Sequence, residues 1–215
     1  MDKRIYKYML YYTEWAVGIV IIGSIVFPLY MWVLNGLGKE SLMQIINDTH
    51  FYTLFFGIIV ALMVGVTFIP LIMQLLIACG STRKEVLKGI VFFSFFYPLQ
   101  VTLIHIVLTL ITRGGYNAGM IGYELTVFAV MSVAVMLFLL DGVLINKVGR
   151  VAYILSIIFI SVLGGVVGFI SANGFDSVVG IAAKTVIMIC SISVIIYAIA
   201  LLFLRAVLKK YEVKS

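Results

Sequence analysis

One polar stretch reads Gly80-Ser81-Thr82-Arg83-Lys84-Glu85-Val86-Leu87-Lys88-Gly89 and separates two apolar runs, residues 53–79 and 90–112. A helix needs about 20 apolar residues to cross the hydrocarbon layer of a bilayer, and each run is long enough. The stretch is therefore predicted to be a short loop that joins two membrane-spanning helices.

The residues of this loop predict the start of a helix. Thr82 is followed three residues later by Glu85, which is the spacing of a capping box. We expect a short helix to begin at Arg83, with Val86 and Leu87 on one apolar side. Such a basic, half-apolar helix either lies among the lipid headgroups or docks into a groove of a partner protein.

The composition indicates an integral membrane protein. Of the 215 residues, 64% are hydrophobic and only 11% are charged, with a mean hydropathy of +1.22. A soluble domain has about 25% charged residues, so this chain has too few to cover a surface that faces water. We predict one all-α membrane domain that occupies residues 1–215.

Six apolar runs predict six membrane-spanning helices. Their predicted bounds are 15–34, 51–79, 90–112, 123–140, 151–172 and 185–204. The segment 2–14, ahead of the first run, mixes basic and aromatic residues and is predicted to be a helix in the membrane interface.

The distribution of basic residues agrees with six spans. Alternate loops place 12 of the 15 Lys and Arg residues on one side of the membrane: Lys3, Arg4, Lys7, Arg83, Lys84, Lys88, Lys147, Arg150, Arg205, Lys209, Lys210 and Lys214. The other side receives Lys39, Arg113 and Lys184. Because basic residues concentrate in cytoplasmic loops, both termini are predicted to be cytoplasmic. The basic charge is no evidence for nucleic-acid binding.

Common catalytic and metal-binding motifs are absent from the sequence. It contains no G-x-x-x-x-G-K-[ST], H-E-x-x-H or G-x-S-x-G. His50, His105, Cys79 and Cys190 lack the spacing of metal ligands. We therefore expect no enzyme activity, no metal and no cofactor in this chain itself.

Polar residues inside the predicted spans include Gln74, Gln100 and His105. Polar side chains are costly in hydrocarbon, so these three either bond neighbouring helices together or line a substrate route. Glu124 and Asp141 lie near the two ends of one span. Each is expected to be solvated or salt-paired rather than to carry protons.

Small residues recur at a spacing of four in two spans. They are Gly57, Ala61 and Gly65 in the second span, and Gly164 and Gly168 in the fifth. Such a stripe permits two helix backbones to approach closely, so we predict helix packing at these residues.

The layout resembles the permease subunit of bacterial ABC-2 type transporters. Two features carry the resemblance: the interfacial segment 2–14 before the first of six spans, and the loop between spans two and three. In the family this loop has Gly, a small residue, Ser or Thr, Arg and a second basic residue, followed by an acidic or aromatic residue and an apolar one. The resemblance implies a short cytoplasmic coupling helix that docks on an ATP-binding subunit, formed by Gly80, Ser81, Thr82, Arg83, Lys84, Glu85, Val86, Leu87 and Lys88.

The resemblance also implies a function. Two permease subunits, identical or related, would face each other in the bacterial plasma membrane above two ATP-binding subunits that hold ATP and Mg²⁺. ATP-driven alternating access would export a hydrophobic or amphipathic cargo, such as a peptide, drug or lipid. The chain departs from the family in its short loop 173–184, where re-entrant helices are often found.

Two alternative functions stay open from the sequence. One is a membrane immunity or sensor protein that binds a peptide or toxin without transporting it. The other is an intramembrane enzyme, for which His105, Glu124 and Asp141 would have to converge.

Overall fold

The computed structural model describes residues 3–34, 36, 38, 52–68, 76–77, 80–113, 118–148 and 183–209. Within these ranges the regular elements are all helices and no strand occurs, which confirms the all-α prediction for this part of the chain. The four long helices are α1 (Lys3–Leu34), α4 (Arg83–Arg113), α5 (Ala118–Val148) and α8 (Ala183–Lys209). A shorter helix covers residues 52–63 and continues into the π-helix η1, Val64–Phe68.

The four long helices are each long and apolar enough to cross a membrane. Their apolar stretches are Ile5–Leu34, Arg83–Ile111, Met120–Ile145 and Lys184–Lys209. A stretch of 26 residues is about 39 Å long at 1.5 Å per residue, which exceeds the hydrocarbon thickness of about 30 Å. The chain therefore has the character of a membrane protein.

Four of the predicted spans lie within these longer helices, and the other two are described only in part or not at all. Of predicted span 51–79, the structure describes the short apolar helix Tyr52–Val66, the end of η1 and two residues further on. Predicted span 151–172 lies outside the described residues. The count of six spans stays a prediction.

The segment predicted as an interfacial helix leading into the first span, residues 2–14, is not separated from that span where the structure describes it, and its position in the membrane interface stays a prediction. α1 runs without a break from Lys3 to Leu34 and includes Pro28. The first turns of α1 are held by packing, because Ile5 and Met9 are buried against Gly89 of α4. The basic and aromatic segment is therefore the first part of the same long helix as the predicted span 15–34.

The separate short coupling helix predicted after residue 82 is wrong. α4 begins at Arg83 as expected, but it continues unbroken to Arg113. Gly89, the last residue of the predicted loop, lies inside α4, where its missing side chain leaves room for Ile5 and Met9 of α1. The loop residues from Arg83 onward therefore form the first turns of the long helix α4.

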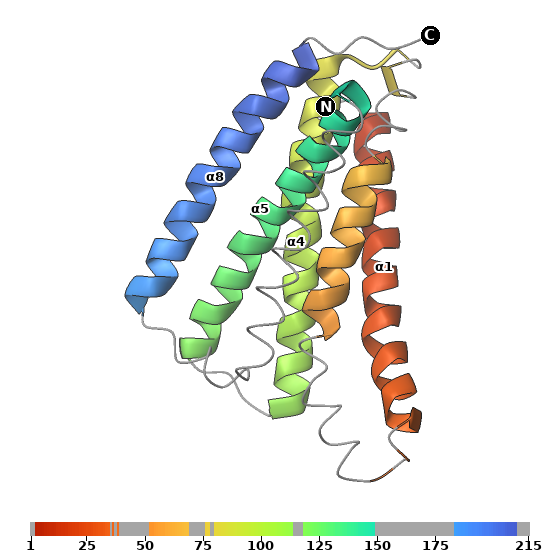
Figure 1. The fold of residues 1–215 in the computed structure, drawn as a ribbon, viewed down its shortest axis with the longest axis vertical. Helices are drawn as coiled ribbons and strands as arrows, with labels where there is room; N and C mark the ends of the chain where they lie inside the picture. The colour runs from red at the N-terminus through yellow and green to blue at the C-terminus, as the bar shows by residue number, and fades with distance from the viewer. Residues whose placement is uncertain are drawn as a thin grey trace.

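α5 lies at the centre of the described bundle. It packs against α4, α8 and η1, while α1 packs against the other side of α4 (Figure 1). The largest fully buried side chains include Phe93 and Tyr97 of α4 and Met136, Phe138 and Leu139 of α5. The core is thus built mainly at the contacts of α4 and α5, while many large apolar side chains of α1 and α8 remain exposed.

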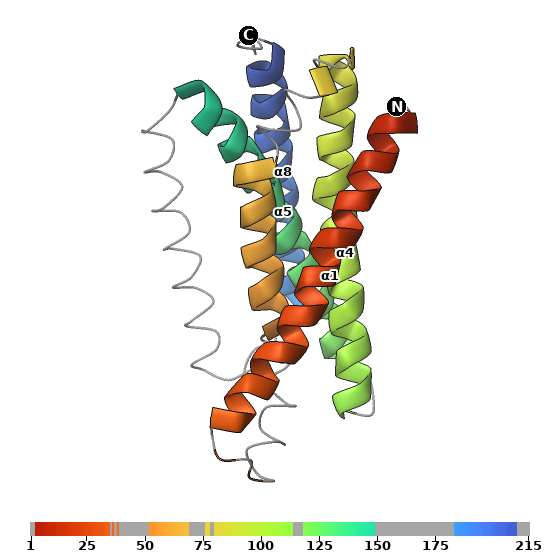
Figure 2. The ribbon, with the colours of Figure 1, turned by 90° about the vertical axis from the view of Figure 1, so that its right-hand side faces the viewer.

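The helix ends are segregated along the long axis of the bundle. The first turns of α1 and α4 and the last turns of α5 and α8 lie at one end in both views (Figures 1 and 2). The last turns of α1 and α4 and the first turns of α5 and α8 lie at the other. Which end faces the cytoplasm stays a prediction.

The helix formed by residues 52–63 approaches α4 and α5 closely at its glycine. A Cβ added at Gly57 would lie 2.5 Å from Met131 Cε and 3.0 Å from Val101 Cγ1. Ala61, one turn further on, is only 1% exposed. Both residues of the predicted stripe therefore lie in the interior.

The third residue of that stripe lies where two backbones nearly touch. A Cβ added at Gly65 would lie 2.7 Å from Phe138 Cβ, and one added at Gly142 would collide with the carbonyl oxygen of Gly65. η1 and α5 can approach this closely only because both positions lack a side chain. The other predicted pair, Gly164 and Gly168, lies outside the described residues.

Candidate functional site

The first candidate site is the start of α4, where the predicted capping box is confirmed. The backbone N–H of Thr82 donates to Glu85 Oε2 at 3.0 Å, and the backbone N–H of Glu85 donates to Thr82 Oγ1 at 3.3 Å. The Thr82 hydroxyl also donates to Glu85 Oε2 at 2.9 Å. Gly80 has a φ of 88°, in the left-handed region that favours glycine, and this turn leads the chain into α4.

Arg83 is exposed but also contacts the end of α8. Its Nη1 donates a hydrogen bond of 2.9 Å to the backbone carbonyl oxygen of Lys209, the last residue of α8. The last carbonyls of a helix lack partners within the helix, and a cation is favourable there. Arg83 therefore ties the start of α4 to the end of α8. No sequence motif signalled this contact between residues 126 apart.

The apolar side of the predicted coupling segment faces inward in this chain. Val86 is 1% exposed, so it is not presented to a partner, whereas Leu87 is partly buried and packs against the same core. The polar residues of the segment are at the surface, and Lys84 and Lys88 are exposed. We call the exposed basic residues here and at the end of α8 the basic end: Arg83, Lys84, Lys88, Arg205 and Lys209.

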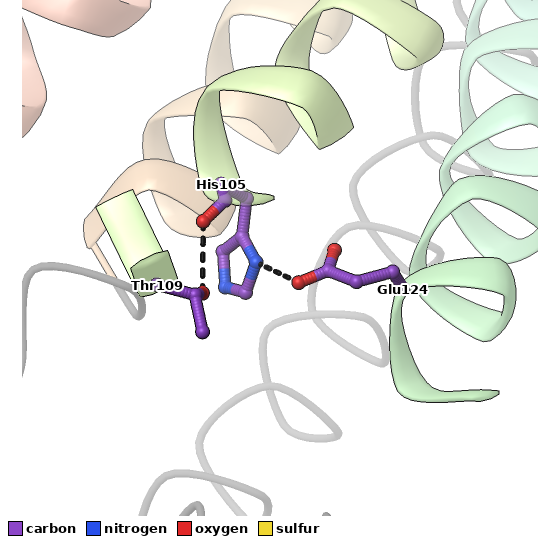
Figure 3. A network of polar contacts seen from close by, with 3 residues as sticks. All are labelled: His105, Thr109 and Glu124. Carbon is purple, nitrogen blue, oxygen red and sulfur yellow. Dashed lines mark hydrogen bonds and ion pairs between the residues drawn. The ribbon is translucent and has the colours of Figure 1, made fainter. Parts of the chain in front are cut away.

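The second candidate site is a buried polar pair between α4 and α5. His105 Nδ1 lies 2.7 Å from Glu124 Oε1, and the Thr109 hydroxyl donates to the carbonyl oxygen of His105 at 2.8 Å (Figure 3). His105 is 0% exposed and Glu124 5%. The ring of Tyr123 lies beside the imidazole, with 5.8 Å between the ring centroids. An imidazole and a carboxylate are thus enclosed together within helices that are long enough to span a membrane.

The sequence predicts that Glu124 is a solvated or salt-paired residue at the end of a span. Glu124 is paired with His105, but it is not solvated, because it is only 5% exposed. α5 begins at Ala118, ahead of the predicted span, so Glu124 lies within the helix and faces α4. Its partner His105 was identified as a polar residue inside a span, but the pairing depends on how α4 and α5 align. Asp141 lies about 25 Å further along α5 at 1.5 Å per residue, so it does not join the pair.

The other predicted polar residues do not meet at this pair. Gln100 lies five residues before His105, about 140° away around the helix, and is therefore on another face of α4. Thr102 lies on the same side of α4 as His105. Among the described residues, Gln100 Oε1, Thr102 Oγ1 and Glu124 Oε2 are buried without a hydrogen-bond partner. Gln74 lies outside the described residues.

Two further hydrogen bonds join α4 to its neighbours, and the sequence analysis missed both. Tyr97 donates its hydroxyl to the carbonyl oxygen of Gly57 at 2.7 Å, and the hydroxyls of Ser94 and Tyr197 share a hydrogen bond of 2.7 Å. The sequence indicates these bonds only in that Ser94, Tyr97 and Tyr197 carry hydroxyl groups within apolar runs. Such groups need hydrogen-bond partners in an interior without water. α4 is therefore bonded to the helix at 52–63, to α5 and to α8.

Comparisons with known proteins identify neither of the two candidate sites. No protein family, curated protein or solved structure matches the chain. Within the described ranges, no three His, Cys, Asp or Glu residues come together in a way that could hold a metal ion. The two candidate sites are thus a charged surface and a buried imidazole–carboxylate pair.

Proposed function

We propose that the chain is the membrane-spanning subunit of an ATP-driven exporter of the ABC-2 type. The observation that supports this function best is the basic end, where a capped helix start presents Lys84 and Lys88 beside the end of α8. A separate ATP-binding subunit with an acidic surface would dock there. The cargo would be hydrophobic or amphipathic, since the helices between which it would pass are almost wholly apolar.

The contacts of α4 suggest how movement at the basic end would reach the membrane. The residues proposed to touch the partner belong to α4, a helix of 31 residues, so a displacement there would move the whole of α4. The Arg83–Lys209 contact would pass part of the same displacement to α8. Rigid helix movements of this kind are a common way of switching between conformations.

The exposed apolar faces of α1 and α8 fit a second permease subunit or lipid. Val194 and Leu202 on α8 are 67% and 65% exposed, and Ile22 and Leu34 on α1 are 62% and 61% exposed. A subunit that pairs with an identical or related copy needs such a face within the membrane. We include the paired subunit in the proposal on this basis.

Co-purification tests this proposal. The chain would be isolated in a mild detergent from its native membrane, as wild type and as the double variant Lys84→Glu with Lys88→Glu. Arg83 is left unchanged because it holds α8. Lys184→Glu is the matched control, because Lys184 is equally exposed but lies at the opposite end of the bundle.

We expect a protein with an ATP-binding phosphate loop to accompany the wild type and the Lys184→Glu control, and to be lost from the double variant. Recovery of no ATP-binding protein with the wild type would contradict the proposal. Recovery of a peptide or toxin instead would favour a membrane immunity or sensor protein.

A further inference from the structure

We propose that the His105–Glu124 pair is a proton-binding site within the membrane, and that release of its proton is linked to separation of α4 and α5. The pair joins two helices that are each long and apolar enough to span a membrane, through a contact of 2.7 Å. Ionisable residues at such positions are costly and are usually functional. This inference goes beyond the proposed exporter and does not depend on an ATP-binding partner.

The charge of the pair explains why a proton is the ligand. With a neutral imidazole and an ionised carboxylate, the pair has a net charge of −1, which is unfavourable away from water. One proton taken from water makes the pair neutral overall, either as imidazolium with carboxylate or as imidazole with carboxylic acid. On release, the same proton returns to water. The two groups share it, so the step belongs to the pair rather than to either residue.

The geometry leaves the carboxylate open to a proton. Glu124 Oε1 faces His105, whereas Glu124 Oε2 is buried and has no hydrogen-bond partner in the described part of the chain. A buried acceptor oxygen without a donor is unfavourable, and protonation of that oxygen would reduce the cost. Thr109 does not ionise, and its hydroxyl is engaged by the carbonyl oxygen of His105.

Few other ionisable groups surround the pair in the described elements. Tyr123 of α5 stacks obliquely near the imidazole, and Cys190 of α8 lies with its Sγ 3.9 Å from the carbonyl oxygen of Leu125. The charged residues at this end are Lys184, exposed on α8, and Arg113, which ends α4 about 12 Å beyond His105. Within the described helices, the Glu124 carboxylate is the charged group in direct contact with the imidazole.

Burial links the proton to helix movement. His105 and Glu124 are enclosed when α4 and α5 pack together, so water reaches them only when the helices part. The neutral pair fits the closed arrangement and the negative pair requires the hydrated, open one. Raising the pH should therefore favour separation of α4 and α5, and lowering it should favour closure. His105 lies eight residues before the end of α4 and Glu124 six residues after the start of α5. These helix ends lie opposite the basic end, so the pair would sense the pH on that side (Figure 1).

The chain offers a direct measurement because it contains only two histidines, His50 and His105. In a His50→Gln background, His105 is the single imidazole and can be observed by NMR with ¹⁵N-labelled histidine. The full chain would be placed in lipid nanodiscs and titrated from about pH 5 to pH 8, where imidazoles change charge. We expect one step in the ¹⁵N signals of His105.

Substitution of the carboxylate gives the comparison. Glu124→Gln should abolish the pH-dependent change of the pair, because the amide neither takes up a proton nor stabilises an imidazolium. Glu14→Gln is the matched control, since Glu14 is an exposed carboxylate on α1, and it should leave the change as in the wild type. If the wild-type ¹⁵N signals of His105 and the carboxyl ¹³C signal of Glu124 both stay constant, or the two variants behave alike, the proton site is refuted. The wild-type titration decides the question even if Glu124→Gln fails to fold.

The proposed link between proton release and the separation of α4 and α5 is tested by a separate measurement. Spin labels at Leu110→Cys of α4 and Ile121→Cys of α5, both exposed, would be placed in a chain in which the two native cysteines are replaced by alanine. We expect their separation to increase as the pH rises in the parent chain and to be insensitive to pH with Glu124→Gln. A separation that does not depend on pH in the parent chain would overturn the linkage.

Discussion

Single polar side chains decide how the described helices are joined. Tyr97 is fully buried, and its hydroxyl reaches the carbonyl oxygen of Gly57 on the helix at residues 52–63. Hydrogen bonds between helices in a membrane protein contribute about 0.6 kcal/mol on average and up to about 1.7 kcal/mol.

Removal of the hydroxyl should therefore have a measurable cost. We expect Tyr97→Phe to lower the free energy of unfolding in micelles by about 0.6 to 1.7 kcal/mol. Tyr8→Phe is the control, because Tyr8 is 55% exposed. Equal stability of the two variants would show that the Tyr97 hydroxyl does not contribute to the fold.

At this scale the sequence indicates which residues matter but not which residues meet. His105 stands out because a polar residue in an apolar run is costly. Its partner Glu124 was placed at the membrane end, because hydropathy alone put the start of that span after the true start of α5. The pairing depends on the alignment of α4 and α5, which no local pattern determines.

α4 is the element that connects the two candidate sites. It begins at the capping box, carries the basic residues in its first turns, and holds His105 eight residues before its end. The sequence predicted where it begins because Thr82 and Glu85 are a local signal. It did not predict that the helix continues through Gly89, since that depends on contacts with α1.

Loss of the cap should weaken the start of α4. Thr82→Ala removes the hydroxyl that accepts from the Glu85 backbone, and substitution of a capping residue by alanine costs about 0.5 to 2 kcal/mol. We expect faster hydrogen exchange in the first turn of α4 and a lower unfolding midpoint. Ser81→Ala is the control, since the contact of Ser81 with Leu76 is made by its backbone N–H. Equal exchange in both variants would contradict the role of the cap.

The close approach of η1 and α5 leads to a prediction about the stability of the fold. A Cβ at Gly65 would lie 2.8 Å from the backbone carbon of Phe138, so Gly65→Ala must push the two elements apart. Overpacking of this kind costs about 1 to 3 kcal/mol. Gly18→Ala is the matched control, because nothing lies within 4 Å of a Cβ at Gly18. We expect only Gly65→Ala to lower the unfolding midpoint, and the opposite order would refute the contact.

The described helices form a bundle with the exposed basic residues Arg83, Lys84, Lys88, Arg205 and Lys209 at one end. Hydropathy and the charge pattern predicted the helical class, the position of most long helices and the clustering of charge, because all three follow from the cost of polar groups in hydrocarbon. The central place of α5 was not predictable, since α1, α4, α5 and α8 are all apolar and their hydropathy does not rank them by burial. The exporter function and the proton site both require these helices to cross a membrane with the basic end on one side.

Cysteine accessibility in intact cells tests that requirement most directly. Lys84→Cys, Lys209→Cys and Lys184→Cys would each be placed in a chain without the two native cysteines, and all three positions are exposed. We expect a membrane-impermeant maleimide added outside to label Lys184→Cys and to label the other two only after the cells are opened. Labelling of all three from outside, or protection of Lys184→Cys with labelling of Lys84→Cys, would contradict the account.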